Sequence, residues 1–380
     1  MVNDTVNLIP LHDETGVARW SRATRFEVEV LDRTEKPRFL LQDVEPGGVL
    51  EWSASASVKG SGRITVRDTG QDIDWLNDRL RFTAYVSDDG GEEYTVPLGV
   101  FLCAAPVGDW DETGRLWEVE LVDKSSILDQ DVIMSPQGTP GTFSLSKGDN
   151  VVEKVKQIIV DTGESVSAID DYDEVLASDI VWDAGTTRLK IINDLLDAAN
   201  FFSLWVDEYG RFRVSKYRAP YERPPAFSTS NPLVESDTSL MSPEWEHDED
   251  IYSIPNRFIA VQNGSDEEEG LVAVATNEDP EDRFSFQARG RWITEMDTGV
   301  EAVDQAALDA LAERRLAAAS DKAATYEIQH VFLPGLKVND TIEFSAGDQR
   351  GVLTVVNNTS VVLDPVVLCD STVRRVRRDR

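Results

Sequence analysis

The sequence is short of basic residues, and this shortage excludes one large class of function. Its 380 residues include 37 Lys and Arg against 70 Asp and Glu, for a formal net charge of -33 and an isoelectric point near 4.4. Proteins that grip nucleic acid neutralise its phosphates with clustered Lys and Arg. A protein that holds DNA or RNA tightly is therefore excluded, and a soluble, acidic surface is expected.

Long hydrophobic runs are also missing. No segment approaches the roughly 18 uncharged apolar residues of a membrane-spanning helix, and residues 1–13 lack the basic start and apolar core of a signal peptide. We therefore expect neither a membrane span nor export by a signal peptide. Hydrophobic residues still make up 41% of the chain, so the acidity is not that of a disordered polymer. Two or three domains are expected at roughly 100–200 residues each.

Residues that usually carry catalysis or bind metals are scarce. The three histidines, His12, His247 and His330, have no metal-ligand spacing to one another or to the two cysteines, Cys103 and Cys369. No Gly-x-Ser-x-Gly elbow or Cys–His pairing is present. We predict no catalytic residue, no metal site and no cofactor. We interpret His330 as a structural histidine and both cysteines as small buried hydrophobes on strands.

The acidic residues leave some alternatives open. Asp-Thr-Gly, the tripeptide that aspartic proteases use in pairs, occurs at Asp68, Asp161 and Asp297. Asp161 ends an expected helix and Asp68 enters a turn, so we interpret these tripeptides as turns. The acidic runs at 170–174 and 266–269 lack the pattern of an EF-hand, and we interpret them as solvated loops, with adventitious calcium or magnesium as the alternative. No glycosidase-type pair can be located among 70 acids.

The first third of the chain has a succession of short β-strands. Residues 25–31 alternate apolar and charged residues, which is typical of a half-buried strand, and similar segments recur between turns rich in Pro, Gly and Asp. Many short strands separated by turns predict an antiparallel barrel or sandwich. We predict an N-terminal segment over residues 1–19 and a first β-barrel-like domain over residues 20–134.

Helical patterns appear in the middle of the chain. Asn150 can cap a helix whose apolar stripe runs from residue 151 to residue 159. A second helix over residues 187–200 leads into a β-hairpin. These elements predict a small α+β domain over residues 149–217, followed by a Pro-rich loop over residues 218–247.

The last third returns to β structure. Strand patterns around residues 257–263, 271–276 and beyond 326 surround a helix expected over residues 301–320. We predict a second β-barrel-like domain over residues 248–372 and a basic tail over residues 373–380. The expected fold class is mainly β, with two β-barrel-like domains flanking a small helix-plus-hairpin domain.

Some aromatic and basic residues outside the expected cores are candidates for contacts between subunits. Aromatic residues in turn-rich segments qualify because aromatics are enriched in the cores of interfaces. Arginines of the C-terminal tail qualify because they can dock on an acidic neighbour. The predicted interface residues are Trp75, Leu76, Trp110, Arg374, Arg375 and Arg377.

Several segments follow one another in a characteristic order. They are GSGRITVRDTGQDIDWLNDRL at 60–80, VPLGVFLCAAP at 96–106, VELVDKSSILDQD at 119–131, NDLLDAANFFSLWVDEYGRFRVSKY at 193–217, ERRLAAAS at 313–320 and LPGLKVNDTIEF at 333–344. In this order they resemble the tail hub proteins of long-tailed viruses of bacteria and archaea, also called baseplate hub or minor tail proteins. The resemblance extends over most of the chain, and its elements are architectural rather than catalytic.

The resemblance implies a structural virion protein and not an enzyme. It implies a homotrimer whose six β-barrel-like domains form a pseudo-six-fold ring between the six-fold tail tube or distal tail protein and the three-fold tail tip. The implied partners are those proteins, the tape measure protein, a tail tip or fibre protein, and viral DNA that passes through the lumen without sequence-specific binding. No membrane insertion is implied.

The resemblance also implies a place in the tail tip or baseplate of the virion, after assembly in the host cytoplasm. Some relatives append lysozyme, peptidase or fibre domains, whereas this chain ends shortly after its last expected strands. We therefore expect cell-wall cutting and receptor binding to belong to other proteins. Acidic side chains are expected to line the lumen and repel DNA phosphates.

Two other classes of function stay open from the sequence. A carbohydrate-active or peptidase enzyme of the tail tip would gather two carboxylates of raised pKa in a pocket. A receptor-binding tip protein would present exposed aromatics in a shallow groove. The Lys-poor, acidic composition fits either a high-salt host or a GC-rich genome, and it does not indicate whether the tail contracts.

Overall fold

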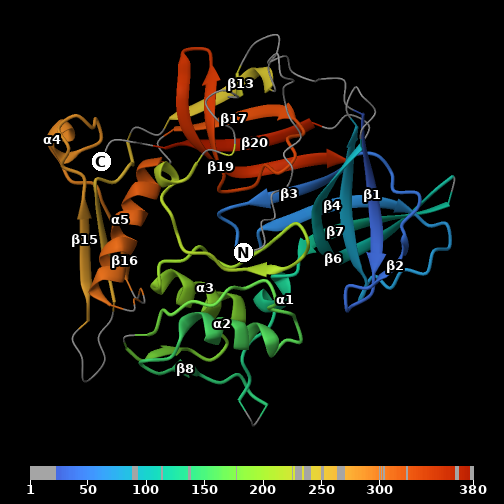
Figure 1. Ribbon diagram of the computed structural model, residues 1–380, viewed down its shortest axis with the longest axis horizontal. Coiled ribbons are helices and arrows are strands. Elements are labelled where there is room, and N and C mark those ends of the chain that lie inside the picture. Colours follow the sequence, from blue (N-terminus) through green and yellow to red (C-terminus); the bar gives the residue numbers. More distant parts are fainter. Residues whose placement is uncertain are drawn as a thin grey trace.

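The computed structural model describes residues 23–87, 93–112, 114–135, 138–176, 178–224, 226, 233–234, 241–249, 252–262, 270–298, 300, 302, 304–321, 324–363 and 368–376. Within these ranges a large, almost entirely antiparallel sheet dominates, with three small sheets and a few helices beside it (Figure 1). The prediction of a mainly β fold is confirmed. No helix in the described ranges is long and apolar enough to cross a membrane.

The first β unit contains seven strands, in the spatial order β3-β4-β7-β6-β5-β1-β2. Alternating apolar residues on these strands face a shared core, in which Phe82 and Phe101 meet edge to face with ring centroids 5.6 Å apart. The strands are β1 (Ala23–Leu31), β2 (Pro37–Leu40), β3 (Gly48–Ser53), β4 (Gly60–Arg67), β5 (Arg79–Ser87), β6 (Glu93–Asp111) and β7 (Gly114–Asp123).

The second β unit continues the same sheet, in the order β13-β17-β20-β19. Strand β19 connects the two units because its last residues pair antiparallel with β3, from Asn358 opposite Ser53 to Leu363 opposite Gly48. The strands of this unit are β12 (Leu233–Val234), β13 (Met241–Glu249), β17 (Ala324–Val331), β18 (Thr341–Ala346), β19 (Gln349–Leu363) and β20 (Leu368–Arg375).

The insert lies below the large sheet in Figure 1 and has its own core. Asn150 caps α2 by accepting a hydrogen bond from the Glu153 N–H, and the predicted apolar stripe is buried, which confirms that helix. Thr187 caps α3 in the same way. The elements are α1 (Ser126–Asp129), β8 (Phe143–Leu145), α2 (Val151–Val160), β9 (Ile180–Trp182), α3 (Arg188–Ala198), β10 (Trp205–Val206), β11 (Phe212–Arg213) and the 3-10 turn η1 (Pro220–Glu222).

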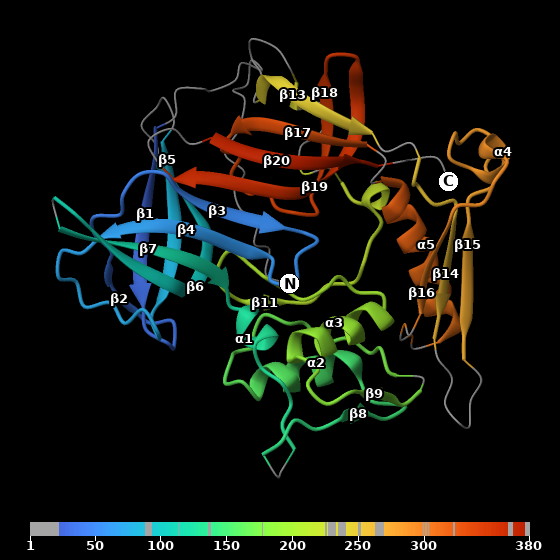
Figure 2. The ribbon, with the colours of Figure 1, turned by 180° about the vertical axis from the view of Figure 1, so that it is seen from behind.

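A three-stranded sheet, which we call the lateral sheet, stands at one end of the molecule (Figures 1 and 2). Its order is β15-β14-β16, and a helix, α5, packs its leucines against one face. The elements are β14 (Arg257–Val261), β15 (Val272–Thr276), α4 (Phe286–Arg289), β16 (Thr294–Thr298) and α5 (Gln305–Asp321).

Several elements differ from the sequence-based expectation. The strands expected at 257–263 and 271–276 form the separate lateral sheet, because an alternating pattern predicts a buried face but not the partner strands. The expected Pro-rich loop contains η1, β12 and most of β13. Within the segment expected as a basic tail, Val373 is buried and Arg374 and Arg375 complete β20. The domain limits themselves stay predictions.

The pairing of β19 with β3 makes a testable prediction about stability. Leu363 is buried in the core of the first unit although it lies more than 200 residues away in sequence. Leu363→Ala should lower the free energy of unfolding by about 2–4 kcal/mol and speed amide hydrogen exchange in both β3 and β19. The control is Val181→Ala on β9, an exposed position where a change below about 0.5 kcal/mol is expected. Unchanged exchange in β3 would contradict the pairing.

Candidate functional site at the junction of the large sheet and the insert

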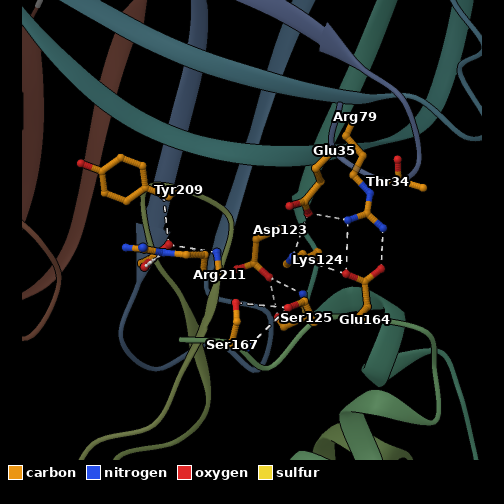
Figure 3. Close-up of polar contacts among 12 residues, drawn as sticks. Thr34, Glu35, Arg79, Asp123, Lys124, Ser125, Glu164, Ser167, Tyr209 and Arg211 are labelled. Carbon is orange, nitrogen blue, oxygen red and sulfur yellow. Dashed lines mark hydrogen bonds and ion pairs between the residues drawn. The ribbon is translucent and has the colours of Figure 1, made fainter. Parts of the chain in front are cut away.

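Four charged side chains meet where the insert contacts the first β unit (Figure 3). Arg79 lies at the start of β5, Lys124 follows β7, Glu35 lies in the β1–β2 turn and Glu164 follows α2. Arg79 donates from Nη1 to Glu35 Oε1 at 2.6 Å and from Nη2 to Glu164 Oε1 at 2.5 Å. Lys124 Nζ lies 2.8 Å from Glu35 Oε1 and 3.3 Å from Glu164 Oε2. We call these four residues the junction cluster.

The junction cluster balances its charges within a buried space. The side chains of Arg79 and Lys124 are only 4% and 3% exposed. Burial alone would raise the pKa of Glu164, but the hydrogen bond and charge of Arg79, helped by Lys124, keep that pKa below its usual value. Glu35 has a positive φ of 65°, a strained backbone for a residue other than glycine, which persists only where surrounding contacts hold it. The cluster therefore fixes the insert to the first β unit.

Asp123 supports the same junction from the end of β7. Its Oδ2 accepts a hydrogen bond from the Gly60 N–H at 2.6 Å, and its Oδ1 accepts from the N–H and hydroxyl of Ser125 at 2.8 and 2.5 Å. Burial raises the pKa of Asp123. Burial also lowers the pKa of the neighbouring Lys59, although the charge of Asp123 opposes that shift.

The turn of the β10–β11 hairpin packs against the first β unit beside the junction cluster. Asp207 accepts hydrogen bonds from the N–H groups of Tyr209 and Arg211 at 3.0 and 2.9 Å, which shapes the turn. Gly210 has a φ of 77°, and a Cβ at this position would lie 2.7 Å from the Cβ of Val100 on β6. Glycine is required here both for the backbone conformation and for the close approach.

A cavity of about 580 Å³ lies between the large sheet, the insert and α5. Charged side chains around it join the three parts. Arg314 of α5 donates to Asn200 Oδ1 at 2.8 Å and also contacts Asp197 of α3. Lys337 Nζ of the second unit lies 2.7 Å from Glu208 Oε2 of the insert hairpin. The cavity is therefore bordered by ion pairs that hold the parts together.

Two carboxylates of raised pKa, Asp123 and Asp340, line this cavity, which is the feature expected of the enzyme alternative. Each of them, however, accepts hydrogen bonds within its own turn. Asp340 Oδ2 accepts from the Lys337 N–H at 2.8 Å, as Asp123 accepts from Ser125. No hydrogen bond joins the two carboxylates in the described part of the chain. The arrangement fits structural turns better than a catalytic pair.

The predicted interface residues fall into two groups. Trp75 packs on Trp117 with ring centroids 6.0 Å apart, and the Arg115 guanidinium lies 3.7 Å from the Trp117 ring and 5.8 Å from the Trp110 ring. Trp75 and Trp110 therefore belong to one stack.

Leu76 and Trp110 are exposed, at 88% and 72%. Arg374 and Arg375 lie elsewhere, on β20, and Arg377 is outside the described residues.

Other sequence predictions have mixed outcomes. His330 is confirmed as structural, since its Nδ1 lies 2.7 Å from the Val331 carbonyl and its Nε2 lies 2.8 Å from the Ser371 hydroxyl in a buried site. The aspartates of the three Asp-Thr-Gly tripeptides lie in the first β unit, the insert and the lateral sheet, and are not brought together. Both cysteines are free.

The described residues contain no group of three or more His, Cys, Asp or Glu placed to hold a metal ion.

Sequence reasoning missed the junction cluster. Its members are 44 to 89 residues from their hydrogen-bond partners, so no local spacing connects them. The one available signal was Lys124, a lysine inside an otherwise strand-like run of a Lys-poor chain.

The junction cluster predicts a large effect of removing one carboxylate. Glu164→Gln leaves two buried cations with one carboxylate, so the free energy of unfolding should fall by roughly 3 kcal/mol. The matched control is Glu29→Gln, which breaks the partly exposed pair with Arg81 and should cost below about 1 kcal/mol. Denaturant titration of the three proteins measures both effects. Equal losses in the two variants would contradict the role given to the cluster.

Asp340 predicts a specific pH dependence. Burial raises its pKa from 3.8 to about 6 in the folded protein. The folded state therefore binds a proton at Asp340 more tightly than the unfolded state does. The stabilisation from this bound proton is complete below about pH 4 and is lost as pH rises through about 6. Asp340→Asn should be more stable than the wild type at pH 7 by roughly 2 kcal/mol, with the gap closing by pH 4. Parallel stability curves for the two proteins would contradict the assignment.

Two solved structures with the same fold are tail proteins. The tail protein from Neisseria meningitidis MC58 matches with a TM-score of 0.62 and 13% identity, covering 92% of this chain and 96% of its own. The 43 kDa tail protein of prophage MuSo2 from Shewanella oneidensis matches with a TM-score of 0.62 and 13% identity, covering 92% and 98%.

A third similar structure comes from a secretion system. The E. coli c3393 protein is a component of the type VI secretion system with structural similarity to the T4 bacteriophage tail proteins gp27 and gp5. It matches with a TM-score of 0.50 and 11% identity, covering 89% of this chain and 76% of its own. No protein-family model matches the sequence, and no curated protein matches it. The chain therefore has the fold of phage tail proteins, which confirms the resemblance to tail hub proteins at the level of the fold.

Proposed function

We propose that this chain is a structural protein of a virus particle, the hub of its tail or baseplate. The observation that carries the proposal is the fold shared with phage tail proteins over more than nine tenths of the chain. In this chain the fold contains one large sheet that runs through both β units without a break. The buried ion pairs of the junction cluster and those around the cavity hold the parts of the chain to one another, as a structural subunit requires.

The hub is a homotrimer in this proposal. Each chain contributes two β units side by side, so three chains contribute six units to a ring with three-fold symmetry. Such a ring joins the six-fold tail tube or distal tail protein on one side to the three-fold tail tip or fibre protein on the other. The predicted domain limits, with two β units flanking the α+β insert, describe the repeating subunit of this ring.

The proposed ring encloses a lumen through which viral DNA and the tape measure protein pass. The net charge of -33 supports a lumen wall lined by carboxylates, because like charge prevents DNA from binding during its passage. The protein then resides in the tail tip or baseplate of the virion after assembly in the host cytoplasm.

We propose that the chain is not itself an enzyme. Asp123 and Asp340, which line the cavity, are engaged as hydrogen-bond acceptors within turns. A receptor-binding groove is also less well supported, since the exposed aromatics among the described residues come from four different places in the fold. They are Trp110 on β6, Tyr209 in the insert hairpin turn, Tyr221 in η1 and Tyr252 between β13 and β14.

The mass of the purified protein in solution tests this function. Light scattering should give three times the chain mass of 42.3 kDa, and negatively stained images should show rings. Peptidoglycan and polysaccharide hydrolysis assays should show no activity above buffer. A stable monomer with hydrolytic activity, lost in Asp340→Asn, would contradict the hub and favour the enzyme.

A further inference from the structure

The lateral sheet has one covered face and one open face. Alternate residues of β14 and β15 face α5, and the paired registers place nine residues of the three strands on the opposite side. Five of the nine are apolar, three are threonines and one is Arg257. The apolar five are Ile259, Val261, Val272, Val274 and Met296.

One corner of this open face is covered, because the Trp292 ring lies 4.9 Å from the Arg257 guanidinium, which also donates from Nε to Thr294 Oγ1 at 2.9 Å. The apolar residues of β15 and β16 on this face are exposed. Val272, Val274 and Met296 are 53%, 56% and 57% exposed. None of the nine positions is acidic, although the chain carries 70 Asp and Glu. This face is apolar, exposed and free of carboxylates in a very acidic protein, and such a composition is typical of a contact surface.

A second unpartnered surface lies on the far half of the β6–β7 hairpin. Strand β6 pairs with β5 only as far as Leu102, and beyond it a bulge with a positive φ at Ala105 bends the strand away. No other described strand pairs with the outer edge of residues 103–111. Val107 is 60% exposed and Trp110 is 72% exposed.

The two surfaces are complementary in character and lie at opposite ends of the molecule. The far half of the hairpin carries the exposed acids Asp109 and Glu112 and one arginine, Arg115, beside Trp110. Arg257 is the single charged residue among the nine of the open face. Figures 1 and 2 place the lateral sheet and the hairpin at opposite ends of the long axis. One chain cannot bring its own two surfaces together, but neighbouring chains can.

We infer that the open face of the lateral sheet is the docking site for the β6–β7 hairpin of a second copy of this chain. Val107 and Trp110 of one copy cover the apolar residues of the other, and Arg257 meets the acidic hairpin tip. A contact between two different surfaces is heterologous and closes into a ring when the rotation between copies allows it. This inference rests on the proposed trimer and names the surfaces that hold it together.

Two variants with a matched control test the contact. Val274→Glu places a carboxylate on the open face, and Val107→Glu places one on the hairpin. The control is Val181→Glu, the same substitution at an exposed strand position of the insert. Both interface variants should weaken subunit association by about tenfold or more, while the control stays trimeric. Circular dichroism and thermal unfolding under dissociating conditions should show all three folded.

The outcomes separate this inference from the proposed function. A wild type and two interface variants that are equally trimeric would overturn the docking site and leave the hub intact. A wild type that is monomeric at every concentration would overturn both. Loss of association in the control as well would also overturn the docking site, because the effect would then be that of added charge alone.

Cysteine cross-linking tests the geometry directly. A chain with both Trp110→Cys and Val274→Cys should form covalent dimers and trimers under mild oxidation, and neither single variant should, because the contact joins unlike surfaces. The wild type, whose Cys103 and Cys369 are partly or fully buried, gives the background. Cross-linking of the Trp110→Cys single variant to itself would overturn the heterologous contact.

Discussion

The pairing of β19 with β3 joins the two β units into one sheet. Each β unit alone would have an open edge at this position, with unpaired backbone groups and part of its core uncovered. Strand β19 pairs with this edge from Asn358 to Leu363, so the backbone groups are hydrogen-bonded. Its Val361 and Leu363 side chains also enter the core of the first unit and cover it. The two units are thereby held at one fixed angle, and the insert and α5 can pack beneath a single rigid sheet.

Charged side chains are paired inside the molecule, whereas most acidic side chains on the surface face solvent. At the junction, Arg79 and Lys124 are almost fully buried and each contacts both Glu35 and Glu164, so no charge is left unmatched. Arg314 plays the same part between α5 and α3. Of the acidic residues that the structure describes, only Asp78, Asp123 and Asp207 are buried, so most of the negative charge in these ranges faces solvent, where salt screens the mutual repulsion. The open face of the lateral sheet differs from the rest of the surface because none of its nine residues is acidic.

The sequence predicted best the features that are local. Helix α2 was predictable because Asn150 and its apolar stripe lie within one short segment, and the strands of the first unit were predictable from alternation. The stack of Trp75 and Trp110 was predictable only as exposed aromatics, since Arg115, which connects them, has no pattern of its own. The junction cluster joins residues far apart in the chain. The end of β20 could not be predicted, because Val373 is followed by two arginines that are typical of a basic tail.

In the proposed hub, the two β units of one continuous sheet form one third of a ring. A cryo-electron microscopy map of the assembled protein, or of tails that contain it, tests this most directly. We expect a three-fold ring with six β densities around the lumen, in which the β19–β3 ladder joins the two β units of each chain. A map with one or two copies, or with the two β units of a chain separated from each other, would contradict it.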